Sequence, residues 1–88
     1  MSALRLDKWL WQARFIRSRQ LADGLIAARR VRVNEQLVAK THQLVRPGDV
    51  ITLTEREHVR VLRVRALGER RGPAIEARDL YEEIARVE

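Results

Sequence analysis

The chain has no cysteine. The absence of cysteine excludes disulfide bonds and thiolate metal sites, and it is compatible with a reducing compartment. No apolar run approaches the roughly 20 residues of a membrane span. The N-terminal segment lacks the apolar core of a signal peptide. We therefore expect a cytoplasmic protein that does not enter a membrane.

Patterns that carry catalysis or hold a cofactor are also missing. The sequence has no glycine-rich phosphate loop and no metal-ligand spacing. Its two histidines, His42 and His58, lie in or beside predicted turns without a nucleophile or carboxylate partner nearby in sequence. A chain of 88 residues forms one domain at most and buries a modest core, which argues against a deep ligand pocket. We expect a non-enzymatic protein with no cofactor and no metal.

Positive charge is abundant and unevenly distributed. The net charge is +6 and the pI is near 11.2. Residues 1–33 contain eight Lys or Arg and two Asp, a net charge of +6. Residues 34–66 have a net charge of +2, and residues 67–88 have a net charge of −2. This asymmetry predicts a polyanion-binding face in the first third of the chain.

Two short amphipathic helices are predicted in that first third. Apolar residues at i, i+3, i+4 and i+7 predict a helix over residues 6–15. Ser18 is the candidate N-cap of a second helix, and Arg19 and Asp23 are spaced to pair on its surface. The expected buried stripes are Leu6, Trp9, Leu10 and Ala13, then Leu21, Ala22, Leu25 and Ile26. For Trp11, off the first stripe, we favour packing under the C-terminal helix, with base stacking still open.

Short strands follow the helices. Val31 and Val33 alternate with a polar residue, and Asn34-Glu35 is a candidate hairpin turn before residues 36–38. Pro47-Gly48 fits a type II turn that begins a strand over residues 50–53.

The polar residues 55–57 connect that strand to a last strand over residues 59–66. Its apolar parity shifts after Val61, which predicts a bulge or burial on both faces. After the breaker segment 68–73, Ala77, Leu80, Tyr81 and Ile84 recur at helical spacing and predict a C-terminal helix. The expected fold is α+β, with two N-terminal helices packed on a small, mostly antiparallel sheet and a C-terminal helix.

Arginines gather around the turn between the two N-terminal helices. Arg14, Arg17 and Arg19 lie at the start of the second helix, where free N–H groups and the helix dipole attract anions. Guanidinium groups match phosphate oxygens in two-pronged geometry. Further arginines within residues 29–32 follow the second helix, roughly 15 Å away if it has three turns. For Arg29 and Arg30, simple complementation of the helix dipole remains an alternative.

Several motifs resemble a known RNA-binding domain. They are R-L-D-K-W-L-W-x-A-R-F at residues 5–15, R-S-R-x-L-A at residues 17–22 and R-V-R-V-N at residues 30–34. The pattern resembles the domain first seen in the fourth small-subunit ribosomal protein. Its start, together with R-R-G-P-A…E-A…L-Y-E-E at residues 70–83, resembles the bacterial heat shock protein 15 family.

The resemblance implies the alpha-L RNA-binding motif over residues 4–66 and a C-terminal helical extension over residues 67–88. It implies a protein that binds large ribosomal subunits blocked with a nascent chain still attached to tRNA. Such a protein contacts large-subunit rRNA and peptidyl-tRNA and assists rescue or recycling of the subunit. We expect it to act as a monomer.

The predicted RNA-binding residues combine these motifs with the neighbouring basic positions. Arg5 and Arg19 are the strongest candidates for phosphate contact, and Asp7 is a candidate to orient one of them. Replacing both arginines with Ala is expected to weaken binding and leave the fold intact. The full set is Arg5, Asp7, Lys8, Arg14, Arg17, Ser18, Arg19, Gln20, Arg30, Arg32, Asn34 and Lys40.

The chain departs from the family pattern at two positions. Arg29 stands where the family usually has Gly, so it needs either a left-handed backbone or a different helix ending. Glu35 stands where the family favours Gly after Asn34, and Glu fits a two-residue hairpin turn less well. Both departures concern the backbone more than RNA contact.

Two other functions remain open at the level of sequence. The chain could be an accessory that binds tRNA or, non-specifically, DNA, because its two helices superficially resemble a helix-turn-helix. It could also be the targeting module of an RNA-modifying enzyme, although a chain this short has no room for the catalytic domain. Competition between folded RNA and duplex DNA separates RNA from DNA binding.

Overall fold

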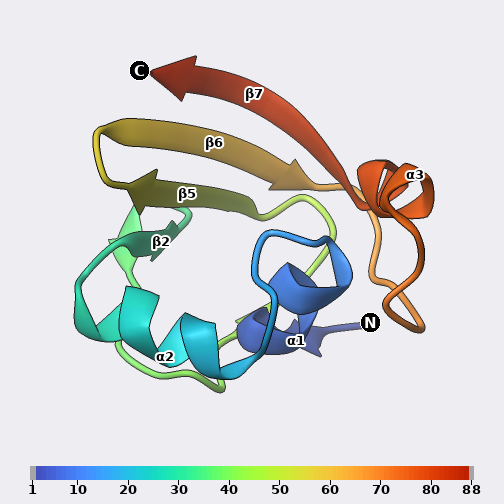
Figure 1. The fold of residues 1–88 in the computed structure, drawn as a ribbon, viewed down its shortest axis with the longest axis horizontal. Helices are drawn as coiled ribbons and strands as arrows, with labels where there is room; N and C mark the ends of the chain where they lie inside the picture. Colours follow the sequence, from blue (N-terminus) through green and yellow to red (C-terminus); the bar gives the residue numbers. More distant parts are fainter. Residues whose placement is uncertain (1, 88) are drawn as a thin grey trace.

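A computed structural model describes residues 2–87, in which two helices near the N-terminus are followed by a run of strands, a short helix and a last strand (Figure 1). All the elements are short: the longest helix is α2, with eight residues, and the longest strands are β6 and β7, with seven residues each. In chain order they are β1 (Leu4–Arg5), α1 (Leu6–Gln12), α2 (Gln20–Ala27), β2 (Val31–Val33), β3 (Gln36–Leu37), β4 (Leu44–Val45), β5 (Val50–Glu55), β6 (His58–Val64), α3 (Ala74–Ala77), a 3-10 turn (Arg78–Leu80) and β7 (Tyr81–Val87).

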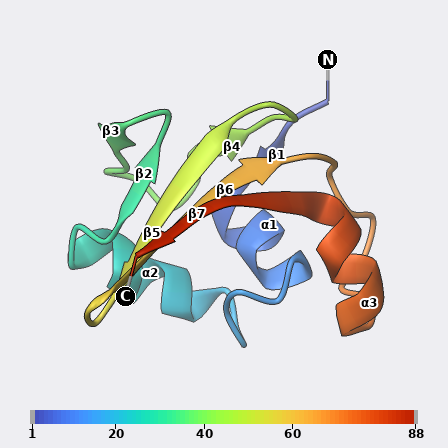
Figure 2. The ribbon, with the colours of Figure 1, turned by 90° about the horizontal axis from the view of Figure 1, so that it is seen from above.

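An antiparallel five-stranded sheet in the order β3-β2-β5-β6-β7 forms one layer, and a small β1–β4 pair lies apart from it. The core lies between this sheet and the two N-terminal helices, with α1 contributing Leu6, Trp9 and Leu10, all fully buried. Figure 2 shows the β2–β3 hairpin and α3 at opposite ends of the molecule. The predicted α+β class with a mostly antiparallel sheet is confirmed.

Turn chemistry predicted two turns of the chain correctly. Asn34 and Glu35 have φ values of 51° and 70°, so both occupy the left-handed region that a two-residue hairpin turn requires. Gly48 has a φ of 97°, which fits its place after Pro47 in a type II turn. Trp9 lies in the core as predicted, and its indole Nε1 donates to the Ala66 carbonyl at 3.0 Å.

Both N-terminal helices end on an arginine in the left-handed conformation. Arg14 has a φ of 65° and Arg29 a φ of 60°. The N–H of Phe15 donates to the Leu10 carbonyl, and that of Arg30 donates to the Leu25 carbonyl, as in a Schellman ending. The left-handed backbone expected at Arg29 is therefore confirmed. The predicted extent of the first helix, residues 6–15, is wrong because Arg14 ends it at Gln12.

The start of α2 also differs from the prediction. The helix begins at Gln20 without a side-chain cap, and the N–H of Leu21 donates instead to the backbone carbonyl of Ser18. Leu21 was expected in the buried stripe but is 50% exposed, because Ala22 and Ile26 face the core. Arg19 pairs with Asp7 rather than with Asp23, so the predicted surface pair is also wrong.

The C-terminal helix is shorter than predicted, and the segment after it is a strand. α3 ends at Ala77, and β7 pairs antiparallel with β6. Its partner register shifts between Val61 and Leu62, which leaves Ile84 as an extra residue in β7. This bulge disrupts the two-residue alternation of the strand and leaves apolar residues at spacings that imitate a helix. The helical prediction over residues 81–84 is therefore wrong.

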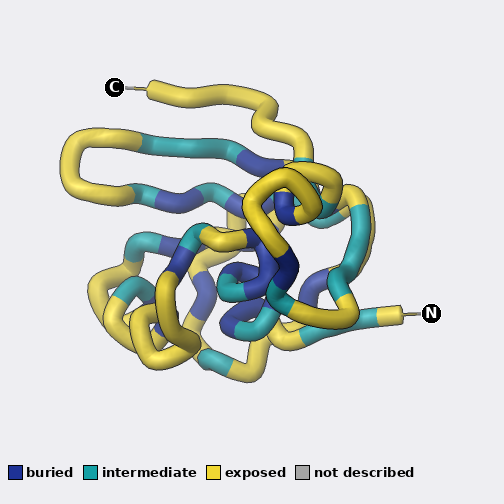
Figure 3. The backbone as a smooth tube through the Cα atoms, turned by 45° about the vertical axis from the view of Figure 1, so that its right-hand side comes forward, coloured by how far each residue is buried: buried dark blue, intermediate teal, exposed yellow. Residues whose placement is uncertain are grey.

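β6 itself pairs with β5 without a shift, from Glu55↔His58 to Val50↔Arg63. Leu62 and Val64 face the core, whereas Val59 and Val61 are half-buried on the other face. The parity shift seen in the sequence therefore reflects a strand with apolar residues on both faces, with the bulge in its partner. β7 is the edge strand farthest from α1 and α2 (Figure 1), and Figure 3 shows it exposed along almost its whole length.

Candidate nucleic-acid interface

Asp7 brings two arginines together that are 14 positions apart in the sequence. It lies in the first turn of α1 and is 5% exposed. Arg5 donates to its carboxylate from Nε at 3.1 Å and from Nη2 at 2.9 Å. Arg19 approaches from the other side, with Nη2 at 3.4 Å from both Asp7 oxygens. We call these three residues the arginine pair and its carboxylate.

The arginine pair is held firmly but remains accessible. The arginine side chains are 46% and 44% exposed, so most of their N–H donors can reach a ligand. Asp7 also accepts the N–H of Lys8 at 2.8 Å, which fixes the carboxylate to the helix. Because one carboxylate offsets one of two guanidinium charges, the group keeps a net positive charge. Two oriented guanidiniums suit bidentate contact with phosphate oxygens.

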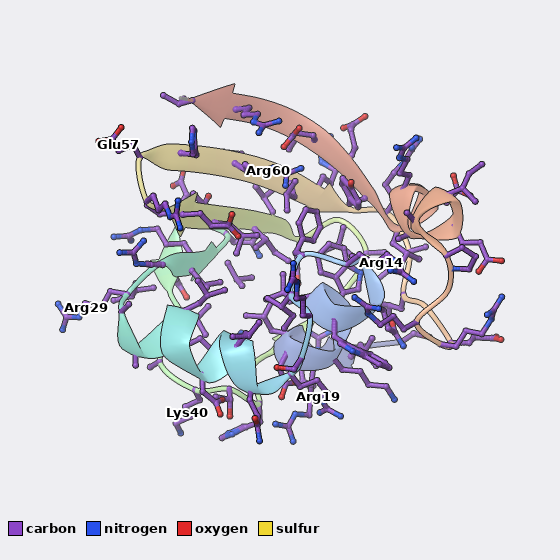
Figure 4. The ribbon with its side chains drawn as sticks, viewed as in Figure 1. Arg14, Arg19, Arg29, Lys40, Glu57 and Arg60 are labelled. Atoms are coloured by element: carbon purple, nitrogen blue, oxygen red, sulfur yellow. The ribbon has the colours of Figure 1, made fainter. Side chains whose placement is uncertain are left out.

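Three other predicted residues lie beside this pair in sequence. Lys8 follows Asp7 on α1 and is half-buried, whereas Ser18 and Gln20 flank Arg19 and are exposed. Lys40 is exposed in the loop between β3 and β4. Figure 4 shows Lys40 and Arg19 projecting from the same side of the molecule, below α2 and α1. These placements are compatible with one basic face.

Arg14 does not join the arginine pair. Its Nε donates to the Gly72 carbonyl at 2.7 Å, so its guanidinium lies against the C-terminal segment. Figure 4 shows Arg14 and Arg19 on different sides of the end of α1. The prediction that Arg14, Arg17 and Arg19 gather around the start of one helix is therefore wrong for Arg14.

Arg17 and Arg30 lie near opposite ends of α2 and share one surface of the protein. Both line an open groove of about 700 Å³ along that helix, together with the exposed Leu21. Arg56 closes the same groove from the β5–β6 turn. One residue from each of the two basic clusters seen in the sequence therefore lines this groove, whose other lining residues are mostly apolar and include Glu55.

The predicted residues of the β2–β3 hairpin are engaged within the protein. Asn34 accepts the N–H of Val50 at 2.9 Å and donates to Asp49 at 3.1 Å, which ties the hairpin to β5. Arg32 donates to the Glu35 carbonyl at 3.2 Å. These bonds give Asn34 a structural role that the sequence did not indicate.

Sequence reasoning missed a group of residues at the other end of α1. Arg71 donates from Nε to the Trp11 carbonyl at 3.0 Å, and its guanidinium lies 5.6 Å from the centre of the Trp11 ring. Trp11 packs against the core, as favoured above. Gln12 is buried beside this segment. These contacts join residues about 60 positions apart, so no local pattern could have indicated them.

The described residues show neither a metal site nor a membrane span. Within residues 2–87 no cluster of three or more His, Cys, Asp or Glu side chains is placed to bind a metal ion. Over the same range no helix has the length and apolar character needed to cross a bilayer.

Comparison with known proteins gives consistent matches. The S4 domain family matches residues 4–51. Heat shock protein 15 of Escherichia coli strain K12 is 43% identical over 82 residues, covering 93% of this chain and 61% of that protein. The heat shock protein 15 homolog of Haemophilus influenzae is 38% identical over 80 residues, covering 91% of this chain and 60% of that protein. The chain thus spans about three-fifths of the length of these curated relatives.

A solved structure is similar over nearly the whole chain. It is described as the trimeric heat shock protein 15 of Vibrio cholerae and superposes with a TM-score of 0.86 at 36% sequence identity. The match covers 96% of this chain and 84% of that one. The similarity therefore extends beyond the S4 domain into the C-terminal segment.

Proposed function

The chain belongs to the heat shock protein 15 family and carries an S4 domain, and on that premise we propose that it binds large ribosomal subunits blocked with nascent chain-tRNA. An RNA-binding, ribosome-associated role is what the family supports. The finer proposal is that the protein contacts large-subunit rRNA and peptidyl-tRNA in the cytoplasm and assists rescue of the subunit. It acts by binding, without catalysing a reaction.

The observation that carries this proposal is the arginine pair and its carboxylate. Asp7 holds Arg5 and Arg19 side by side, at 2.9 Å and 3.4 Å, while leaving nearly half of each side chain exposed. Preorganised guanidiniums lose less rotamer entropy when they bind phosphate. The net charge of +6 in residues 1–33 adds a long-range attraction for RNA.

The direct test removes the pair without leaving a buried charge alone. Replacing only Arg5 and Arg19 would leave Asp7 buried without its two partners, so the sequence-based expectation that the fold stays intact does not hold for that variant. We therefore choose Arg5→Ala, Asp7→Asn and Arg19→Ala together. The triple variant lowers the net charge by one, and Arg63→Ala is a control with the same charge change on β6.

We expect the triple variant to bind a large-subunit rRNA fragment at least tenfold more weakly, since two phosphate contacts are lost. Arg63→Ala should bind nearly as well as the parent. Circular dichroism and melting temperature check that both variants fold. If the folded triple variant binds as tightly as the parent, the assigned face is wrong.

The ribosomal part of the proposal is tested by sedimentation. We expect the protein to travel with separated large subunits that carry peptidyl-tRNA, rather than with small subunits or intact ribosomes. Co-sedimentation with all particles alike would reduce the function to general RNA binding. Competition of duplex DNA against folded RNA tests non-specific DNA binding in the same preparation.

We also propose that the chain acts as a monomer. The Vibrio cholerae relative is described as trimeric, so the assembly state needs a measurement. Light scattering of the free protein and of its RNA complex gives the mass directly. A mass of three chains at micromolar concentration would replace the monomer by the assembly described for that relative.

The division of the chain into an RNA-binding domain, residues 4–66, and an extension, residues 67–88, is retained as a proposal. The extension is continuous with the domain, because β7 pairs along β6.

A further inference from the structure

The C-terminal segment encloses a small cavity against the end of α1. The cavity has a volume of about 210 Å³ and is lined chiefly by Gln12, Gly68, Glu69, Arg70, Gly72 and Glu76. Pockets for drug-sized ligands occupy about 300–1,000 Å³, so this one suits a single planar ring system. It lies outside the arginine pair and outside the groove along α2.

Gln12 presents an unpaired amide to this cavity. The side chain is 1% exposed, yet neither Nε2 nor Oε1 has a hydrogen-bond partner within residues 2–87. Buried amides are almost always hydrogen-bonded, because an unpaired donor or acceptor opposes folding. An amide kept in this position offers one acceptor and two donors to a ligand.

Gly68 allows the chain to approach that amide closely. A Cβ atom at residue 68 would lie 2.7 Å from Gln12 Oε1 and 3.3 Å from the Arg70 carbonyl oxygen. No side chain could occupy this place without moving Gln12. The glycine therefore brings the cavity wall directly against the amide.

The cavity is lined by one guanidinium, that of Arg70, and by the carboxylates of Glu69 and Glu76. Arg70 pairs with Glu76 at 3.0 Å, and its side chain remains 68% exposed. Arg14 and Arg71 each bind a backbone carbonyl, of Gly72 and Trp11 respectively, and hold the segment against α1. The charges beside a ligand in the cavity are therefore mixed, so recognition there rests on the Gln12 amide rather than on phosphate contact.

The cavity is close to the arginine pair along the same helix. Gln12 follows Asp7 by five residues, a rise of roughly 7.5 Å along α1. Trp11, which carries Arg71 on its ring, lies one turn after Asp7 and on the same side of the helix. Gln12 itself lies about 140° around the helix axis from Asp7, so an RNA that contacts both features must reach around the end of α1.

We propose that this cavity receives a single unpaired nucleobase of the bound RNA, with adenine preferred. Adenine presents an amino donor beside a ring-nitrogen acceptor, and a glutamine amide pairs with both at once. Sequence-specific RNA recognition commonly takes unstacked bases in this manner. The inference rests on the proposed RNA binding and names the feature of the RNA that the C-terminal segment recognises.

The test compares two RNA hairpins that differ by one bulged adenosine. Gln12→Leu keeps the volume of the side chain and removes the amide. We expect it to reduce affinity for the bulged hairpin by about tenfold, to leave affinity for the fully paired hairpin unchanged, and to raise the melting temperature. Gln36→Leu, the same exchange at an exposed position on β3, should change neither affinity.

Three further measurements test the inference if Gln12→Leu folds poorly. Gly68→Ala places a methyl group against Gln12 Oε1 and should produce the same selective loss. In the parent chain, the side-chain amide signals of Gln12 in a nitrogen–proton NMR spectrum should shift with the bulged hairpin and not with the paired one. Replacing the bulged adenosine with uridine should weaken binding.

The outcomes separate this inference from the proposed function. If both hairpins bind equally to parent, Gln12→Leu and Gly68→Ala, and the Gln12 signals do not move, the cavity is structural and the inference is wrong. The proposed RNA binding then still stands or falls with the triple variant at the arginine pair. If neither hairpin nor rRNA binds the parent, both proposals are wrong.

Discussion

Asp7 is the residue on which the geometry of the arginine pair depends. The sequence makes it a candidate to orient one of two neighbouring arginines. In the structure it contacts two arginines and the N–H of Lys8 while nearly fully buried. A carboxylate in this position reduces the local positive charge but fixes where the remaining charge points. These two effects have opposite consequences for RNA binding.

The variant Asp7→Asn distinguishes orientation from charge. It raises the net charge by one, so a simple count of charges predicts tighter RNA binding. We expect weaker binding, because Arg5 and Arg19 lose the carboxylate that aligns them. Because both arginines are nearly half exposed and can rehydrate, the cost in folding free energy should be only about 1 kcal/mol. Fluorescence anisotropy with an rRNA fragment and thermal unfolding measure the two effects.

An increase in affinity for Asp7→Asn would mean that orientation is unimportant and that charge alone drives binding. Lys8→Ala, which removes a neighbouring charge without touching the carboxylate side chain, serves as the comparison. It should weaken binding through charge alone. A larger loss for Asp7→Asn than for Lys8→Ala is therefore the signature of orientation.

Among the elements, α1 and α2 both end on an arginine in the left-handed conformation, but the two arginine side chains have different roles. Arg14 and Arg29 both occupy the left-handed region directly after their helices, where glycine is favoured. Arg14 also donates to the Gly72 carbonyl, whereas Arg29 has no side-chain hydrogen bond or ion pair with any residue between 2 and 87. Figure 4 shows Arg29 pointing outward from the far end of α2.

Matched glycine substitutions at these helix ends should therefore differ. Arg29→Gly relieves left-handed strain and is expected to be neutral or to stabilise the fold by up to about 1 kcal/mol. Arg14→Gly relieves the same strain but loses the bond to Gly72, worth about 1 kcal/mol, so no net gain is expected. Thermal unfolding of both variants measures the difference. A clear fall in melting temperature for Arg29→Gly would show that its side chain supports the helix end.

The elements that sequence predicted well are those determined by local chemistry. The hairpin turn at Asn34-Glu35 and the type II turn at Pro47-Gly48 depend on residues within the turn, and both were predicted. The end of α1 was not, because an arginine occupies the position where a glycine would have signalled it. The strand β7 was mistaken for a helix because the bulge at Ile84 disturbs its alternation.

β7 is held by contacts that no local pattern contains. Tyr81 packs against Phe15 with ring centroids 4.7 Å apart, and Arg60 lies 5.0 Å from the centre of the same Phe15 ring. Burial by itself lowers the pKa of Arg60, but the hydrogen bond and charge of Glu83 outweigh it and raise the pKa. Arg60 therefore stays charged, and this attachment of β7 to the sheet should not depend on pH near neutrality.

Contacts between residues far apart in sequence also limit how much of the candidate site the sequence can predict. Arg5, Asp7 and Arg19 were selected from sequence, and their mutual contacts add geometry to that selection. Gln12 was not selected, because an amide on a short helix carries no signal until the C-terminal segment is placed against it. Long-range packing, rather than residue type, is what distinguishes these two cases.

At the scale of the whole molecule, the contributions of the arginine pair and of the cavity at Gln12 to RNA affinity should be separable by varying the salt concentration. The net charge of +6 resides in the same third of the chain as the arginine pair, so counterion release should dominate affinity. The cavity at Gln12 lies beside the acidic C-terminal third and contributes a neutral amide. One feature therefore controls the salt dependence, and the other controls affinity for a particular RNA.

The whole-molecule prediction follows from this separation. For the bulged hairpin, the logarithm of the binding constant should fall linearly with the logarithm of salt concentration. The triple variant Arg5→Ala, Asp7→Asn and Arg19→Ala should make that slope shallower by about 2, since each lost phosphate contact contributes about 1. Gln12→Leu should lower every point of the line by the same amount and leave the slope unchanged. Isothermal titration at four salt concentrations measures both quantities. A change of slope in Gln12→Leu equal to that in the triple variant would mean that the cavity binds phosphate rather than a base.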